Sequence, residues 1–254
     1  MITTEPVAHL KKILILIVFL VLVGTPRIVV ANQSNFLASS SEVDDSFQYL
    51  EDLRNSIKRS LQKAPNSWKL YWRLARVQFY LGNRSANEEE QKNLYTLCIQ
   101  NAERSIELNS ESVGGNYFNA VCSGKMGQLN GIWSSFSMIS EFREQMQRTV
   151  QLDPKFEFGG PHRALGKLFH DLPFFLGGDL KQSIEHLKLA VKLGPEYSDN
   201  YYYLAESLFD AEEYKSAESA LSVYLEKSRN EKDANQKRER AADFLQQIKM
   251  ILQH

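Results

Sequence analysis

The residues best suited to chemistry gather in one stretch of this 254-residue chain, Gly159–Asp179. His162 and His170 are eight residues apart on one predicted helix, so their Cα atoms would lie about 12 Å apart, too far to share a metal ion. Asp171 beside His170 could orient its ring, but no nucleophile motif accompanies the pair. His186 belongs to the next predicted helix. We therefore expect no metal ion and no catalytic residue here.

The glycines of this stretch could also suggest a nucleotide site. A phosphate-binding loop needs a preceding strand and a Lys followed by Ser or Thr, and a dinucleotide-binding loop needs G-x-G spacing. The stretch has neither pattern. We expect no cofactor, and we interpret the chain as a protein that is not an enzyme.

The glycines and prolines of the stretch are better explained as structural. Pro161 suits the first turn of a helix, because proline lacks an N–H that would have no partner there. Pro173 would end that helix, and Asp179 with Gln182 would cap the next one. The residues expected to have structural roles are Gly159, Gly160, Pro161, Gly166, Pro173, Gly177, Gly178 and Asp179.

An apolar triplet, 174–176, falls in a predicted turn, where apolar residues are unusual. A second predicted insertion, one repeat unit earlier, brings two more aromatic residues, and stacking of the units would place both insertions at one edge. These side chains either pin the insertions to the fold or form an apolar surface for a partner or ligand, and both interpretations stay open. For the arginine of the stretch, a salt bridge is favoured over a ligand role. The candidate binding residues are Trp133, Phe136, Arg163, Phe174 and Phe175.

The elements that must position these residues repeat along the chain. Four segments resemble the ends of amphipathic helices, and their last residues are 45, 44 and 41 positions apart. Such a period is typical of helical solenoids. After the last segment, Tyr201, Leu204, Ala205 and Leu208 follow the tetratricopeptide pattern of large and small residues. The four segments are 57–65, 102–110, 146–154 and 187–195.

This repeat predicts an all-α fold, a tetratricopeptide-like solenoid over 44–254 with Gly166 at a helix crossing. We expect a first helix over 44–62, four helix pairs over 68–227, and a final helix over 233–252 that covers the open end of the stack. The usual unit has about 34 residues, so the surplus is expected in elongated turns within the repeats. These turns are predicted near 83–93, 128–136 and 171–178.

Residues 1–31 have the three-part layout of a secretory signal peptide. Lys11 and Lys12 precede an apolar run over 13–23, and small residues lead to Ala31. The run is short for a bilayer span, which needs about 20 residues. We predict cleavage after Ala31 and a periplasmic or secreted protein, with membrane anchoring by an uncleaved segment as the alternative. Residues 32–43 are polar and rich in serine, as in a flexible lead-in.

Charge and cysteine content narrow the possible functions further. The formal net charge is −1 and no basic stripe is present, which argues against nucleic-acid binding. Cys98 and Cys122 are the only cysteines. They could pair in an oxidising compartment, but two small buried side chains in helices are the favoured interpretation.

The run "GGPHRALG", followed by "LP" and "GGDLKQSIEHLKLAVKLGPEY", resembles the tetratricopeptide-type T component of tripartite (TRAP) transporters over 152–208. The resemblance implies a periplasmic helper without enzyme activity that associates with a solute-binding protein. It also implies an apolar cleft. That family is commonly lipid-anchored, whereas this chain has no cysteine near Ala31 to acylate. The function predicted is an exported tetratricopeptide scaffold for a protein partner, with a carrier of a small apolar ligand as the alternative.

Overall fold

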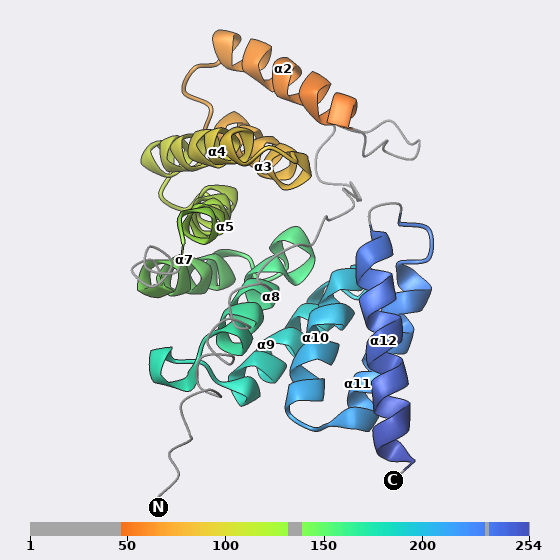
Figure 1. The fold of residues 1–254 in the computed structure, drawn as a ribbon. Helices are drawn as coiled ribbons and strands as arrows, with labels where there is room; N and C mark the ends of the chain where they lie inside the picture. The colour runs from red at the N-terminus through yellow and green to blue at the C-terminus, as the bar shows by residue number, and fades with distance from the viewer. Residues whose placement is uncertain (1–46, 132–138, 232–233, 254) are drawn as a thin grey trace, which may run out of the picture.

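The computed structural model describes residues 47–131, 139–231 and 234–253. Over these ranges the chain forms ten α-helices and one 3-10 turn, and contains no strand. The helices follow one another in a curved stack, with α2 and α12 at its two ends (Figure 1). The all-α prediction is confirmed.

The helices come as a first helix, four pairs and a last helix, as the repeat predicted. The extra residues of the first pair were expected in an elongated turn near 83–93. In the structure they mostly lengthen the helices, because α3 runs to Arg84 and α4 already begins at Glu88. The helices are α2 (Phe47–Lys63), the pairs α3 (Trp68–Arg84) with α4 (Glu88–Leu108), α5 (Val113–Asn130) with α7 (Ile139–Leu152), α8 (Phe156–Asp171) with α9 (Leu180–Leu193) and α10 (Ser198–Asp210) with α11 (Tyr214–Lys227), and α12 (Asn235–Leu252).

Small residues allow the helices to approach where they cross. Ala75, Ala120 and Ala205 on the first helices of three pairs are buried, and Gly166 takes the same place in α8. A Cβ atom on Gly166 would lie 2.5 Å from Cγ of Leu187 in α9. The backbone of α8 therefore lies directly against a side chain of its partner helix, as expected for a crossing position.

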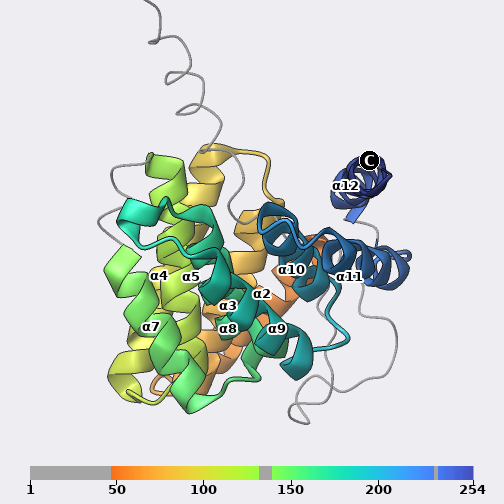
Figure 2. The ribbon, with the colours of Figure 1, turned by 90° about the horizontal axis from the view of Figure 1, so that it is seen from below.

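Three apolar clusters form the core along the stack. The first lies mainly between α2 and α3, the second around α4, α5 and α8, and the third is formed by the four helices from α9 to α12. In the last cluster, Ala241 and Ile248 of α12 are fully buried. Helix α12 therefore covers the C-terminal end of the stack, as Figures 1 and 2 show from two directions.

Within the bounds of α8, a left-handed turn precedes the regular helix. Glu157, Phe158 and Gly159 have φ values of 46°, 57° and 77°. A Cβ atom on Gly159 would lie 2.8 Å from the carbonyl oxygen of Ala190, so glycine is needed for both its φ and its space. Pro161 follows within the first turn of the regular helix, where its missing N–H is tolerated.

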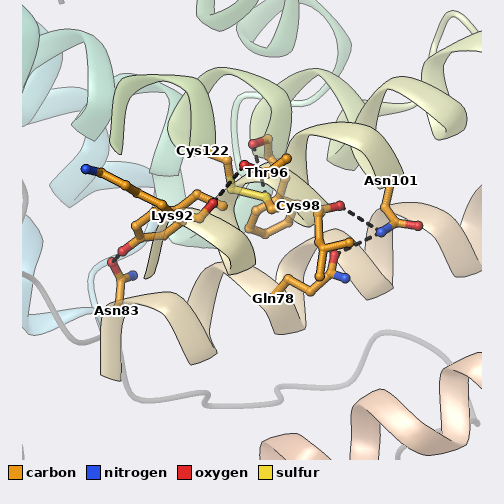
Figure 3. The surroundings of a disulfide bond; sticks show 10 residues. Gln78, Asn83, Lys92, Thr96, Cys98, Asn101 and Cys122 are labelled. Carbon is orange, nitrogen blue, oxygen red and sulfur yellow. Dashed lines mark hydrogen bonds between the residues drawn. A yellow bond between two sulfur atoms is a disulfide. The ribbon is translucent and has the colours of Figure 1, made fainter. Parts of the chain in front are cut away.

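Cys98 of α4 and Cys122 of α5 form a disulfide, with their Cα atoms 6.3 Å apart (Figure 3). Both residues are fully buried, as predicted. The favoured interpretation of two separate thiols differs from the structure, because the stacking of two helix pairs brings the side chains together.

Two groups of predictions fall outside the described residues. The signal peptide over 1–31 and the lead-in over 32–43 form one group, and Trp133 with Phe136 forms the other. None of the described helices has the length and hydropathy that a membrane span requires.

Candidate functional site

Polar side chains from five helices and from the turn before α10 meet inside the stack. Arg76 and Tyr80 lie one turn apart on α3, as do Arg163 and Lys167 on α8, so each pair shares a helix face. Buried charge in this amount is unusual, because such groups are rarely fully buried unless paired. We call this set the inner polar cluster; its members are Arg76, Tyr80, Tyr117, Lys125, Glu157, Arg163, Lys167, Tyr197, Asp199, Tyr203, Glu206 and Lys237.

Glu157 connects the left-handed turn at the start of α8 to α3. One of its oxygens lies 2.9 Å from Nε of Arg76, and the other accepts a 2.8 Å hydrogen bond from the hydroxyl of Tyr80. Burial works to lower the pKa of Arg76, but the charge of Glu157 outweighs it and raises that pKa above its usual value. Burial, followed by the Glu157 charge, raises the pKa of Tyr80. The left-handed turn therefore places a carboxylate against a cation of an earlier repeat.

Arg163, a candidate binding residue, takes its described partners from the protein itself. Its guanidinium lies 4.3 Å from the ring centre of Tyr197 and donates a 3.0 Å hydrogen bond to Oδ1 of Asn200. It also donates to the carbonyl of Glu157 at 3.4 Å. The side-chain amide of Asn200 in turn donates to the carbonyl of Phe158 at 3.0 Å. Arg163 thus holds the left-handed turn, through a carbonyl, an amide and an aromatic face instead of the predicted salt bridge.

A second group of charges surrounds Tyr203. Nζ of Lys167 lies 2.8 Å from Asp171, and Nζ of Lys237 lies 2.7 Å from Asp199. The same two Nζ atoms lie 5.3 Å and 4.8 Å from the ring centre of Tyr203. Both ammonium groups therefore have a carboxylate and an aromatic ring as partners, which offsets the cost of burying them.

Two further charged residues of this group have shifted pKa values. Burial, together with the positive charges of Lys237 and Lys167, lowers the pKa of Lys125 to about 7. Burial raises the pKa of Glu206, although the charge of Lys167 opposes it. The cluster therefore places cations and anions together in a poorly solvated region.

Two histidines from neighbouring helices contact each other. Nδ1 of His162 lies 2.9 Å from Nδ1 of His186 in α9, and His162 is buried. Burial and the charge of His186 lower the pKa of His162 to about 4, and burial lowers that of His186. Direct contact between two imidazoles at this distance requires that at least one be neutral.

His170 lies between two carboxylates. Its ring nitrogens are each 2.9 Å from a carboxylate oxygen, Nδ1 from Asp171 and Nε2 from Asp210. Burial works to lower the pKa of His170, but the two hydrogen-bonded carboxylates raise it to about 9. Across the described ranges, no group of three or more His, Cys, Asp or Glu side chains is placed to hold a metal ion.

The other candidate residues within the described ranges lie on the edge of the stack. Phe174 and Phe175 form a 3-10 turn between α8 and α9, with 92% and 82% of their surfaces exposed. The turn is held by hydrogen bonds from the N–H of Gly178 to Pro173 and from the N–H of Asp179 to Phe169. Asp179 caps α9 by accepting from the N–H of Gln182 at 3.0 Å. Two large apolar side chains are therefore presented to solvent by a firmly bonded turn.

The stacked helix pairs, with small residues at their crossings, define a tetratricopeptide-like helical solenoid. The thermophilic TPR protein TTC0263 of Thermus thermophilus has a similar fold, with a TM-score of 0.60 over 78% of this chain and 91% of that one. The two chains are 16% identical, so this likeness concerns the fold alone.

The family model described as "Regulator of microtubule dynamics protein 1-3" matches residues 32–158, and the chain belongs to this family. Regulator of microtubule dynamics protein 1 of Bos taurus is 28% identical over 127 residues, which cover 50% of this chain and 37% of the relative. The Mus musculus protein of that name is 26% identical over 124 residues, which cover 48% of this chain and 38% of the relative. The chain thus matches well under half the length of these relatives.

This family corrects the predicted location. A periplasmic or secreted protein, with an anchored form as the alternative, was expected, but the family is named for microtubules and its curated relatives are mammalian. The predicted transporter partnership is likewise not supported. The glycines and prolines that carried the resemblance to the T component have roles in helix packing and turns. They therefore indicate the fold, and they do not identify a partner.

The inner polar cluster was missed by the sequence reading, apart from Arg163. Its signal was present as charged residues and tyrosines four apart on the first helices, such as Arg163 with Lys167 and Asp199 with Tyr203. Such spacing also occurs on ordinary solvated helix faces. Only the stacking of the pairs shows that these faces turn toward one another.

Proposed function

We propose that this chain is a scaffold without enzyme activity that binds a protein of the microtubule system and thereby alters microtubule dynamics. The observation that carries the proposal is the family match over 32–158, which includes α2, the first two helix pairs and the start of α8. Solenoids of helix pairs offer extended surfaces for binding. Assembled microtubules are the partner we propose to test first.

The docking residues we propose are Phe174 and Phe175. Exposed aromatic side chains commonly supply a large share of the binding energy at protein interfaces. The hydrogen bonds of Gly178 and Asp179 hold their turn in place before a partner arrives, so little ordering is needed on binding. Arg163 contributes indirectly in this proposal, because it supports the turn at the start of α8, the helix that leads to Phe174.

Purified protein added to dynamic microtubules grown from pure tubulin tests the function. We expect co-sedimentation with microtubules and a changed growth rate or catastrophe frequency. Absence of both effects at protein concentrations well above that of tubulin would contradict direct action on microtubules.

The same assay with paired variants tests the docking residues. Phe174→Ala with Phe175→Ala should weaken microtubule binding by about tenfold or more, while thermal melting stays unchanged because both side chains are exposed. Leu189→Ala is the matched control, since Leu189 is also an exposed apolar residue, at 41%, on α9. If the double variant binds as the wild type does, the docking site lies elsewhere on the scaffold.

A further inference from the structure

The disulfide joins two different helix pairs. Cys98 lies on α4, the second helix of one pair, and Cys122 lies on α5, the first helix of the next. The bond therefore fixes how one repeat sits on its neighbour. Helix α4 also contacts the preceding helix through Tyr95, whose hydroxyl donates a 2.9 Å hydrogen bond to Asn83 (Figure 3).

The surroundings of the two sulfurs suit free thiols as well as a disulfide. Both cysteines lie in an apolar cluster with Ala102, Phe118 and Met146, where a reduced cysteine packs as a small apolar side chain. Sγ of Cys98 lies 3.6 Å from the carbonyl oxygen of Phe118, an acceptor that an S–H group could use. After reduction, both thiols would therefore still lie in surroundings suited to a buried S–H group. The other residues of the apolar cluster would stay packed together.

Helix α5 has a low intrinsic helix propensity beside Cys122, which packing in the core buries fully. Four of its eighteen residues are glycines, the residue with the lowest helix propensity apart from proline. Two of them, Gly124 and Gly127, follow Cys122 within the last part of the helix. A Cβ atom on Gly124 would lie 3.4 Å from the ring of Phe142, so packing does not strictly require glycine there. Local opening of this part of α5 would expose Cys122 without unfolding the stack.

We propose that Cys98 and Cys122 are a reversible thiol–disulfide couple that exchanges with small thiols and disulfides through local opening of α5. When oxidised, the couple clamps the first two helix pairs together. When reduced, it lets α5 move relative to α4. Because Tyr117 and Lys125 of the inner polar cluster lie on α5, the redox state would also change the mobility of that cluster. This inference is independent of microtubule binding.

The couple is oxidised and reduced by thiol–disulfide exchange in two steps. For oxidation, the thiolate of Cys122 attacks a small disulfide such as oxidised glutathione, forms a mixed disulfide and releases one glutathione thiolate. The thiolate of Cys98 then attacks the sulfur of Cys122 and releases the second. Two electrons pass from the cysteine pair to the small disulfide, and the two thiol protons end on the two released thiols at neutral pH. A small dithiol reverses both steps.

The first test follows redox equilibrium in the folded protein. Wild-type protein is incubated in glutathione buffers of varied oxidised-to-reduced ratio, and free thiols are trapped by alkylation and counted by mass spectrometry. We expect a two-electron transition from zero to two alkylated cysteines, with far-UV circular dichroism unchanged. The oxidised form should melt about 10 °C higher, as expected for a bond closing a loop of this length. A pair that stays in one state at every ratio overturns the proposal.

The second test asks whether local opening of α5 controls the exchange. Gly124→Ala strengthens the helix beside Cys122 and should slow reduction by dithiothreitol about fivefold. Leu189→Ala, on the distant helix α9, should leave the rate unchanged. If reduction occurs only at the rate of global unfolding and Gly124→Ala has no separate effect, the bond is a static cross-link and the proposal fails. Reduction faster than global unfolding, slowed by Gly124→Ala, supports it.

Discussion

The carboxylate of Glu157 pairs with the guanidinium of Arg76, 81 residues earlier in the chain. The backbone of Glu157 adopts the left-handed conformation, with φ of 46°, which is unfavourable for residues other than glycine. A partly buried ion pair and a hydrogen bond from Tyr80 offset this strain. The pair joins the turn at the start of α8 to the first repeat, and so connects two parts of the stack that are distant in sequence.

Removing the charge of Glu157 should therefore destabilise the whole stack. We expect Glu157→Gln to lower the free energy of unfolding by about 1–3 kcal/mol, because it leaves the partly buried charge of Arg76 without its counter-ion. Glu107→Gln is the control, since Glu107 pairs with Arg104 at the exposed surface and should leave stability nearly unchanged. Urea unfolding followed by circular dichroism measures both. Equal effects of the two variants would contradict the importance assigned to the buried pair.

Two glycines should respond to alanine in opposite directions. Gly166→Ala places a Cβ atom 2.5 Å from Leu187 and should cost about 1–3 kcal/mol of stability through overpacking. Gly124→Ala meets only the ring edge of Phe142, at 3.4 Å, and should stabilise by about 0.5–1 kcal/mol through helix propensity. Thermal melts of both variants, with the disulfide kept oxidised, check the signs. A stabilising Gly166→Ala would show that α8 and α9 can separate at their crossing.

The acid side of the stability profile should depend on His162. Its folded pKa of about 4 is below the value of about 6.5 for an unfolded histidine. The unfolded chain therefore binds more protons in this range, and stability falls as the pH drops from about 6.5 to 4, by up to about 1.4 kcal/mol per pH unit. His162→Gln should reduce this slope in urea titrations at several pH values. Unchanged slopes would mean that His162 is accessible to protons in the folded state.

The alkaline side should depend on His170, with the opposite sign. Its folded pKa of about 9 exceeds the unfolded value, so its contribution is complete below about pH 6.5 and is lost as the pH rises through 9. Lys125 titrates in an overlapping range, so the difference between wild type and His170→Gln isolates the histidine. That difference should shrink steadily from pH 6.5 to 9. A constant difference across this range would contradict the ion pairs with Asp171 and Asp210.

Local pattern was enough to predict the helices, their pairing and the end cap. Apolar residues three and four apart mark helix faces wherever they occur, and proline and glycine mark their ends, so these features depend on neighbours in the chain. The match of Gly166 to Ala75, Ala120 and Ala205 likewise predicted a helix crossing. The elongated turn that contains residues 174–176 was predicted from the sequence. The extra residues near 83–93 were also expected in a turn, but they extend helices instead, because the acidic run "EEEQ" favours a helix start at Glu88.

The tertiary structure alone decided which polar groups meet. Glu157 forms an ion pair with Arg76, His162 contacts His186, and Cys98 forms a disulfide with Cys122. Each contact joins two helices, and no local sequence pattern specifies it. A charged residue on a helix face has the same sequence signature whether that face meets water or another helix, and stacking determines which. The energetic consequence is large, because the same ammonium or carboxylate group is stabilised by water in one case and needs a protein partner in the other.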